Sequence, residues 1–183
     1  PIYYCFHRIL KWGEKSLREA GLSPFGDGDS EKGFSSIRGT IIHKLIEEYP
    51  FSEDPQTVIR RLIQMERALS SKESEILFKD IVQTWEKIAT QDFMTKIVDL
   101  EDVRKQFDFE LLIDANTLKG RADLVWKEKG ISRLVDFKTG KVEKSTVQKK
   151  ASRYHLQMDS YALFLYSLAP EQEKWPVSLY FVE

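Results

Sequence analysis

The sequence predicts an α/β (α+β) fold in which helices precede and flank a mixed central sheet. Apolar side chains recur three or four residues apart over residues 37–97, which is typical of helices. From residue 107 the pattern changes to alternation and short apolar runs, which is typical of strands. With 183 residues, 42% of them apolar and 31% charged, the chain can bury a substantial core. We expect a single domain over residues 1–183, mainly helical in 1–98 and sheet-containing in 99–183.

Two breaks separate the helices expected in the first half. A loop rich in Gly, Ser and Asp covers residues 21–36, and a segment with two prolines covers residues 50–56. Ser35 or Ser36 is expected to cap the helix after the loop, because a hydroxyl oxygen accepts a bond from a free N–H of the first turn. The predicted helices cover residues 2–20, 37–49, 55–69 and 74–97.

The strands expected in the second half begin with FDFELLI, residues 107–113. This run alternates strictly, so one face of the strand carries its large apolar residues, Phe107, Phe109, Leu111 and Ile113. Two more strands, 119–127 and 132–138, are separated by the turn-like KEKG. A helix over residues 156–168 and a strand over residues 176–182 complete the predicted order.

The segment VDFKTG, residues 135–140, carries two charges inside an apolar strand. Alternate side chains of a strand share a face, so Asp136 and Lys138 point one way while Val135 and Phe137 point the other. Burying a charge without a partner is costly. We therefore expect a partner for this pair of charges.

The preceding strand supplies a second carboxylate, Asp123, which alternation places on one face with Arg121 and Val125. If the two strands form a hairpin, Asp123 approaches Asp136, and two close carboxylates repel unless a cation lies between them. Oxygen ligands favour Mg²⁺ or Mn²⁺, which also bind substrate phosphate. Lys138 could then orient or deprotonate an attacking water, or stabilise charge on a phosphodiester under attack. The alternative is a surface hairpin with cross-strand ion pairs.

Four other polar residues lie on the predicted elements beside these strands. His43 lies on a helix that is otherwise apolar on one side, where it could bind a metal or simply pack. Gln157 and Tyr161 share a helix face and could present an amide and a phenol to a phosphate, or form only a polar edge. Glu110 faces away from the phenylalanine stripe and could reach the acidic pocket.

The formal net charge is −1, so overall charge indicates no class of partner. Cations gather after Lys138, against one anion, Glu143. Such a stretch can neutralise phosphates, or it can be a solvated loop. The candidate phosphate-binding residues are Lys141, Lys144, Lys149, Lys150 and Arg153.

The cysteine content and the length of the apolar runs restrict the cellular location that we expect. Cys5 is the single cysteine, which excludes an intrachain disulfide, and no apolar run reaches membrane-spanning length. We expect a cytoplasmic protein with no membrane association. The chain begins without Met inside a segment that reads as ordered, which suggests a domain excised from a larger protein.

The sequence resembles the PD-(D/E)XK nuclease superfamily, and specifically its RecB-type exonuclease branch. That branch carries a helix with G-x-x-x-H, then G-x-x-D, a D-[YF]-K-T-G strand, and Q-x-x-x-Y on a following helix. The same four elements occur here in that order, as Gly39–His43, Gly120–Asp123, Asp136–Gly140 and Gln157–Tyr161. They span most of the chain.

The resemblance implies a restriction-endonuclease-like core and Mg²⁺- or Mn²⁺-dependent cleavage of DNA. It implies that His43, Asp123, Asp136 and the backbone carbonyl of Phe137 bind the metal, and that Lys138 is the catalytic lysine. Gln157 and Tyr161 would help to hold the active site and the DNA end. The expected partners are single- or double-stranded DNA ends and a fused or associated helicase, in DNA recombination or repair.

Some relatives hold an iron–sulfur cluster through one early and three late cysteines. Only Cys5 is present here, so we expect no iron–sulfur cluster, and an N-terminal helix stabilised by packing through Tyr3, Tyr4, Phe6 and Trp12. Two further readings stay open. One is a catalytically inactive nuclease-fold module that binds DNA or a partner subunit. The other is a plain α+β scaffold with a coincidental acidic hairpin.

Overall fold

The computed structural model describes residues 34–66, 69–100, 102–113, 116–140 and 145–182. Within them, four strands form one mixed sheet in the order β1 (Val103–Ile113), β2 (Asn116–Glu128), β3 (Ile131–Thr139) and β4 (Val177–Val182). The pairs β1–β2 and β2–β3 are antiparallel, and β3–β4 is parallel. This mixed α/β sheet is consistent with a restriction-endonuclease-like fold, so the predicted fold class is confirmed.

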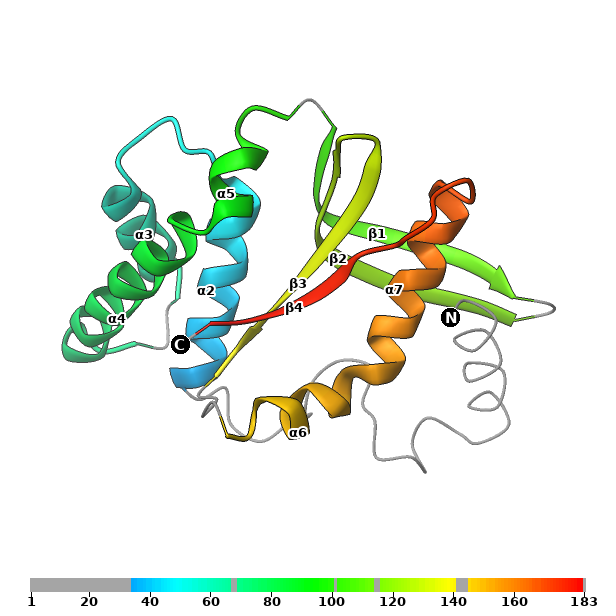
Figure 1. Cartoon of the computed structure of the whole chain (residues 1–183). Helices are drawn as coiled ribbons and strands as arrows, with labels where there is room; N and C mark the ends of the chain where they lie inside the picture. Colours follow the sequence, from blue (N-terminus) through cyan, green and yellow to red (C-terminus); the bar gives the residue numbers. More distant parts are fainter. Residues whose placement is uncertain (1–33, 67–68, 101, 114–115, 141–144, 183) are drawn as a thin grey trace.

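Helices cover both faces of the sheet (Figure 1). The helices are α2 (Phe34–Glu48), α3 (Pro55–Gln64), α4 (Ser71–Ala89), α5 (Asp92–Ile97), α6 (Val147–Ala151), a short 3-10 helix (Ser152–Tyr154) and α7 (His155–Leu168). Helices α2 to α5 lie on one side of the sheet, and α7 lies on the other. Among the described helices, none is long and apolar enough to cross a membrane.

The helical expectations are confirmed in part. Helices α2 and α3 occupy two of the predicted segments, and the prolines between them end one helix and begin the next. The cap prediction at Ser35 or Ser36 is wrong, because α2 already begins at Phe34. The predicted helix over residues 2–20 lies outside the described residues.

The single helix predicted over residues 74–97 is also wrong, because two helices, α4 and α5, occupy this segment. The hydroxyl of Thr90 lies 3.0 Å from the carbonyl oxygen of Glu86 and 3.1 Å from that of Lys87, so it competes for acceptors of the last turn. Gln91 then adopts an extended backbone, with ψ of 139°. Apolar spacing continues through the break because both helices bury side chains in one core.

The hydrophobic core consists of two clusters, one on each face of the sheet. The cluster with α2 to α5 takes its buried strand residues from Leu124, Trp126, Val135, Phe137 and Val182. The cluster beneath α7 contains Phe109, Ala122, Val125, Leu134, Tyr161, Phe164 and Leu165. The predicted alternation is confirmed over residues 107–112, since Phe107, Phe109 and Leu111 face α7 while Leu112 is 78% exposed.

The alternation of β1 and β2 breaks at one place. Val103 packs toward α2 to α5 and Phe107 toward α7, although residues four apart share a face in a regular strand. Between them, Gln106 has a φ of +45°, in the left-handed region. Ala122 and Leu124, two apart on β2, likewise lie in different clusters. The two faces of the strand pair therefore exchange sides at this point, a feature called the turnover below.

Asp123 lies at this turnover on β2, which changes its expected neighbours. Arg121 is exposed and forms an ion pair with Asp108, whereas Val125 is buried beneath α7. The prediction that Arg121, Asp123 and Val125 share one face is therefore wrong. The prediction assumed that side chains alternate between the two faces along the whole of β2.

Helix α2 approaches the end of β3 very closely. A Cβ atom added at Gly39 would lie 2.8 Å from the side-chain oxygen of Thr139, closer than real Cβ contacts allow. On its other flank, Arg38 binds Thr84 of α4 at 2.8 Å and forms an ion pair with Asp80. Glycine at position 39 therefore lets α2, one turn before His43, lie against the strand that carries Asp136.

Candidate active site

Asp123 and Asp136 lie on neighbouring antiparallel strands, as the hairpin hypothesis requires. The register pairs Leu124 with Val135, and the next step toward the open end brings the two aspartates opposite one another. Both are buried, with exposed fractions of 7% and 3%. Two carboxyl groups therefore share an interior position, unlike the exposed cross-strand ion pairs of the alternative reading.

Three elements hold the carboxylate of Asp123. Its Oδ2 accepts a hydrogen bond of 2.7 Å from the backbone N–H of Phe137 on β3. Its Oδ1 accepts one of 2.8 Å from the side-chain amide of Gln106 on β1. The Nδ1 atom of His43 on α2 lies 3.1 Å from the same oxygen. Both oxygens of Asp123 are thus oriented by fixed neighbours.

Asp136 is held from the other face of the sheet by α7. Its Oδ1 accepts a bond of 3.1 Å from the amide of Gln157 and lies 2.7 Å from the hydroxyl of Tyr161. That hydroxyl accepts from Gln157 at 2.6 Å and also lies 2.8 Å from the carbonyl oxygen of Arg121. Gln157 and Tyr161 therefore share a helix face, as predicted, and both reach the acidic pair.

The two carboxyl groups differ in electrostatics. Burial raises the pKa of Asp136, and the charge of Asp123 adds to this, while Lys138 opposes it. Burial also works against the charged form of Asp123, but the bond and charge of His43 and the N–H of Phe137 hold its pKa below the ordinary value. Burial lowers the pKa of His43, yet the two aspartates outweigh it and the net shift is upward.

Lys138 contacts Asp136 of the acidic pair and the ring of Tyr154. Its ammonium lies 2.7 Å from Oδ2 of Asp136 and 4.7 Å from the ring centre of Tyr154, which is within cation–π range. Only 19% of the Lys138 side chain is exposed. The carboxylate and the ring together restrict where this ammonium can lie.

The polar cluster consists of Asp123, Asp136 and the residues that contact them or Lys138. Sequence reasoning missed two of its members, Gln106 and Tyr154. Gln106 is the single amide in the strand VRKQFDFELLI, and Tyr154 precedes Gln157 by one helical turn. These two positions were the sequence signals that could have indicated a role for Gln106 and Tyr154. The suggestion that Glu110 reaches the pocket is wrong, because it is exposed and forms a 3.0 Å ion pair with Lys119, its partner across β1 and β2.

The candidate DNA-binding cations are placed only in part. Lys149 and Lys150 lie on α6 and Arg153 on the 3-10 helix that leads into α7. The ammonium of Lys150 lies 3.4 Å from the carbonyl oxygen of Gly140, directly after β3, which brings α6 to the end of the strand that carries Asp136. The remaining two, Lys141 and Lys144, lie outside the described residues.

The comparison with known families agrees with this geometry. The sequence profile described as the PD-(D/E)XK nuclease superfamily matches residues 14–183, which include every residue of the cluster. The chain belongs to the PD-(D/E)XK nuclease superfamily. Members of this superfamily are generally metal-dependent nucleases, and they typically use divalent ions. A search of the curated proteins found no match.

The cluster fits the divalent ions that the superfamily uses. Oδ2 of Asp136 is buried and, among the described residues, meets no donor with hydrogen-bond geometry, although the ammonium of Lys138 is near. Two carboxylates and an imidazole are ligands that Mg²⁺ or Mn²⁺ accept. Across the described residues, no three His, Cys, Asp or Glu side chains already converge as a metal site. His43 and Asp123, bonded to each other, would have to exchange that bond for the ion.

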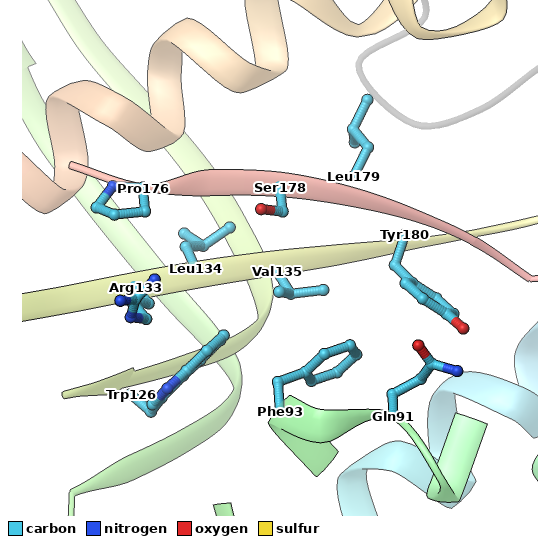
Figure 2. A pocket seen from close by; sticks show the side chains of 10 residues that line it. All are labelled: Gln91, Phe93, Trp126, Arg133, Leu134, Val135, Pro176, Ser178, Leu179 and Tyr180. Atoms are coloured by element: carbon cyan, nitrogen blue, oxygen red, sulfur yellow. The ribbon is translucent and has the colours of Figure 1, made fainter. Parts of the chain in front are cut away.

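A separate hollow lies between α5 and the strands β3 and β4, with a volume of about 370 Å³ (Figure 2). Phe93 stacks on Trp126 with ring centres 6.2 Å apart and meets Tyr180 edge-on at 5.5 Å. This hollow shares no side chain with the acidic pair. It is thus distinct from the cluster that carries the superfamily residues.

We predict that Asp136→Asn does not lower the stability of the metal-free protein at neutral pH and can raise it. Because the folded pKa of Asp136 is raised, its ionisation costs folding free energy above that pKa, and the cost disappears below the unfolded value of about 3.9. Thermal unfolding in a chelator, from neutral to acidic pH, measures this. The difference in melting temperature between the variant and the parent should become smaller as the pH falls.

Asp108→Asn is the matched control, because Arg121 holds the pKa of that exposed aspartate below its usual range. This variant should gain nothing at neutral pH. If Asp136→Asn instead melts clearly below the parent at neutral pH and not at acidic pH, the buried like charges do not oppose folding and this account of the pair is wrong.

Proposed function

We propose that this domain is a Mg²⁺- or Mn²⁺-dependent deoxyribonuclease that hydrolyses DNA phosphodiester bonds, of the RecB-like exonuclease type. One observation carries the proposal. Two buried aspartates stand side by side, with the Lys138 ammonium 2.7 Å from one of them, on the fold of a nuclease superfamily. Acidic residues with an adjacent lysine supply both the ligands and the proton chemistry that phosphodiester hydrolysis needs.

The proposed ligands are Asp123, Asp136, His43 and the backbone carbonyl of Phe137. A divalent cation held there would polarise the scissile phosphate and favour deprotonation of the attacking water. Asp136 would present Oδ2, the oxygen without a hydrogen bond of good geometry among the described residues. Asp123 is kept anionic by its neighbours, which is the state a ligand requires.

Lys138 is the proposed catalytic lysine. Held between the Asp136 carboxylate and the Tyr154 ring, its ammonium can orient the attacking water or stabilise charge on the phosphoryl oxygens. Gln157 and Tyr161 are proposed to fix Asp136 through Oδ1 and to help hold the DNA end. Their mutual bond of 2.6 Å and their contacts to Asp136 support the first of these roles.

The proposed substrates are single- or double-stranded DNA ends. The wider context we propose is a cytoplasmic helicase–nuclease of recombination or repair, in which this single domain is one part. The order of the four motifs, Gly39–His43 to Gln157–Tyr161, supports that assignment. The complete reading frame tests it, since helicase motifs are expected on the same chain or on a partner.

We predict that Asp136→Asn and Lys138→Ala each reduce metal-dependent DNA cleavage by at least about 100-fold. The first removes a ligand charge, and the second removes the ammonium beside the reacting phosphate. Cleavage of end-labelled linear DNA in Mg²⁺ or Mn²⁺ measures the loss. A covalently closed circle of the same sequence should resist the parent protein if it is an exonuclease.

Lys119→Ala, on the exposed hairpin, is the control and should keep the parental rate. If either active-site variant retains the parental rate, the assigned roles are wrong. DNA binding by the parent without cleavage in either metal would instead favour the catalytically inactive module.

The cations Lys141, Lys144, Lys149, Lys150 and Arg153 are proposed to bind the DNA backbone. We predict that Lys149→Ala and Arg153→Ala weaken binding of unrelated DNA sequences equally. Each lost phosphate contact should lower the slope of log affinity against log salt by about 0.7 to 0.9. Fluorescence anisotropy at several salt concentrations measures this slope, and an unchanged slope in the double variant would contradict the role.

A further inference from the structure

We infer that Gln106 is a positioning residue that orients the carboxylate of Asp123 for a divalent cation. This inference rests on the proposed function and adds to it a residue outside the four motifs. Gln106 donates to Asp123 and acts through that carboxylate.

Register brings Gln106 to Asp123. The flanking residues on β1 and β2 pair as Lys105 with Leu124 and Phe107 with Ala122, so Gln106 lies directly opposite Asp123. Its side-chain amide nitrogen donates to Oδ1 of Asp123 over 2.8 Å, in a partly buried position. A residue on the neighbouring strand thereby fixes one oxygen of a proposed ligand.

The backbone of Gln106 is strained in order to reach this position. Its φ of +45° lies in the left-handed region, which is uncommon for a residue with a Cβ atom and persists where the surroundings demand it. The same distortion turns β1 over, so that Val103 and Phe107 face opposite sides of the sheet. Strain of this kind gathers at functional sites, and here its side chain meets a buried aspartate.

The bonds of Asp123 explain why an amide suits this position. The two oxygens receive a bond from Gln106 and one from the Phe137 N–H, while His43 shares Oδ1. If His43 exchanged its bond with Asp123 for a bond to a metal ion, Gln106 and the Phe137 N–H would remain as one neutral donor on each oxygen. Each oxygen would then keep a lone pair for the ion. A neutral donor orients the carboxylate without competing with the cation for its charge. Partners of this kind tune metal affinity by about 10- to 100-fold.

Two variants separate the side chain of Gln106 from its backbone. Gln106→Ala removes the amide and keeps the strain, whereas Gln106→Gly removes both, because glycine adopts positive φ without steric strain. Glu110→Gln is the control, an exposed change on the same strand. Each protein is melted in a chelator and across a Mn²⁺ titration, and DNA cleavage is measured against Mn²⁺ concentration.

We expect Gln106→Gly to melt in the chelator no lower than the parent, yet to need about ten-fold more Mn²⁺ for half of its thermal shift. Both variants should need about ten-fold more Mn²⁺ for half-maximal cleavage and recover at saturating Mn²⁺. A residue that only supports the fold would lower melting in the chelator and leave the Mn²⁺ requirement unchanged.

The outcomes distinguish this inference from the proposed function. If the parent is stabilised by Mn²⁺ and cleaves DNA, and both variants do so at the parental Mn²⁺ concentration, the role of Gln106 is wrong and the proposed function stands. If the parent shows neither response, the proposed function fails and the role of Gln106 fails with it.

Discussion

The carboxylates of Asp123 and Asp136 repel each other inside the protein, and much of the surrounding structure holds them together against that repulsion. Donors reach the pair from α2, β1, β3 and α7, so helices on both faces of the sheet converge on it. Burial strengthens both the repulsion and every bond that opposes it. The fold is thus organised around two buried carboxylates, and the pKa of Asp136 stays raised although Lys138 lies beside it.

The two aspartates meet this constraint differently. His43 and the Phe137 N–H stabilise the charge of Asp123, whereas burial and Asp123 itself oppose the charge of Asp136. The ammonium of Lys138, 2.7 Å from Oδ2 of Asp136, offsets part of that unfavourable charge. In the proposed function a divalent cation would complete the compensation, and a site kept for binding and catalysis can cost stability in this way.

The sequence predicted most of the framework, because its evidence was local. Alternation along VDFKTG correctly separated Phe137 from Asp136, and the KEKG turn correctly joined the strands; Lys129 and Gly130 there have φ of 51° and 81°, as a tight hairpin turn requires. The motif spacing also brought Gln157 and Tyr161 to one helix face. Each of these depends on residues close in the chain.

What the sequence could not predict depended on distant partners or on broken periodicity. The turnover at Gln106 exchanges the faces of β1 and β2, so counting by two misplaced Arg121 relative to Asp123. Glu110 does not reach the pocket because the register pairs it with Lys119 on β2. The break after α4 lies at Thr90 and Gln91, within an unbroken apolar pattern, so apolar spacing alone did not reveal it. Such features depend on contacts with a neighbouring strand or helical turn, and the spacing of residues in the sequence does not show those contacts.

Crystals of the protein grown or soaked with Mn²⁺ and measured at a wavelength where manganese scatters anomalously test the central claim most directly. We expect one anomalous peak between the two strands, about 2.1 Å from an oxygen of Asp123 and from Oδ2 of Asp136. The absence of an anomalous peak at that position, with the two carboxylates turned apart, would contradict the account.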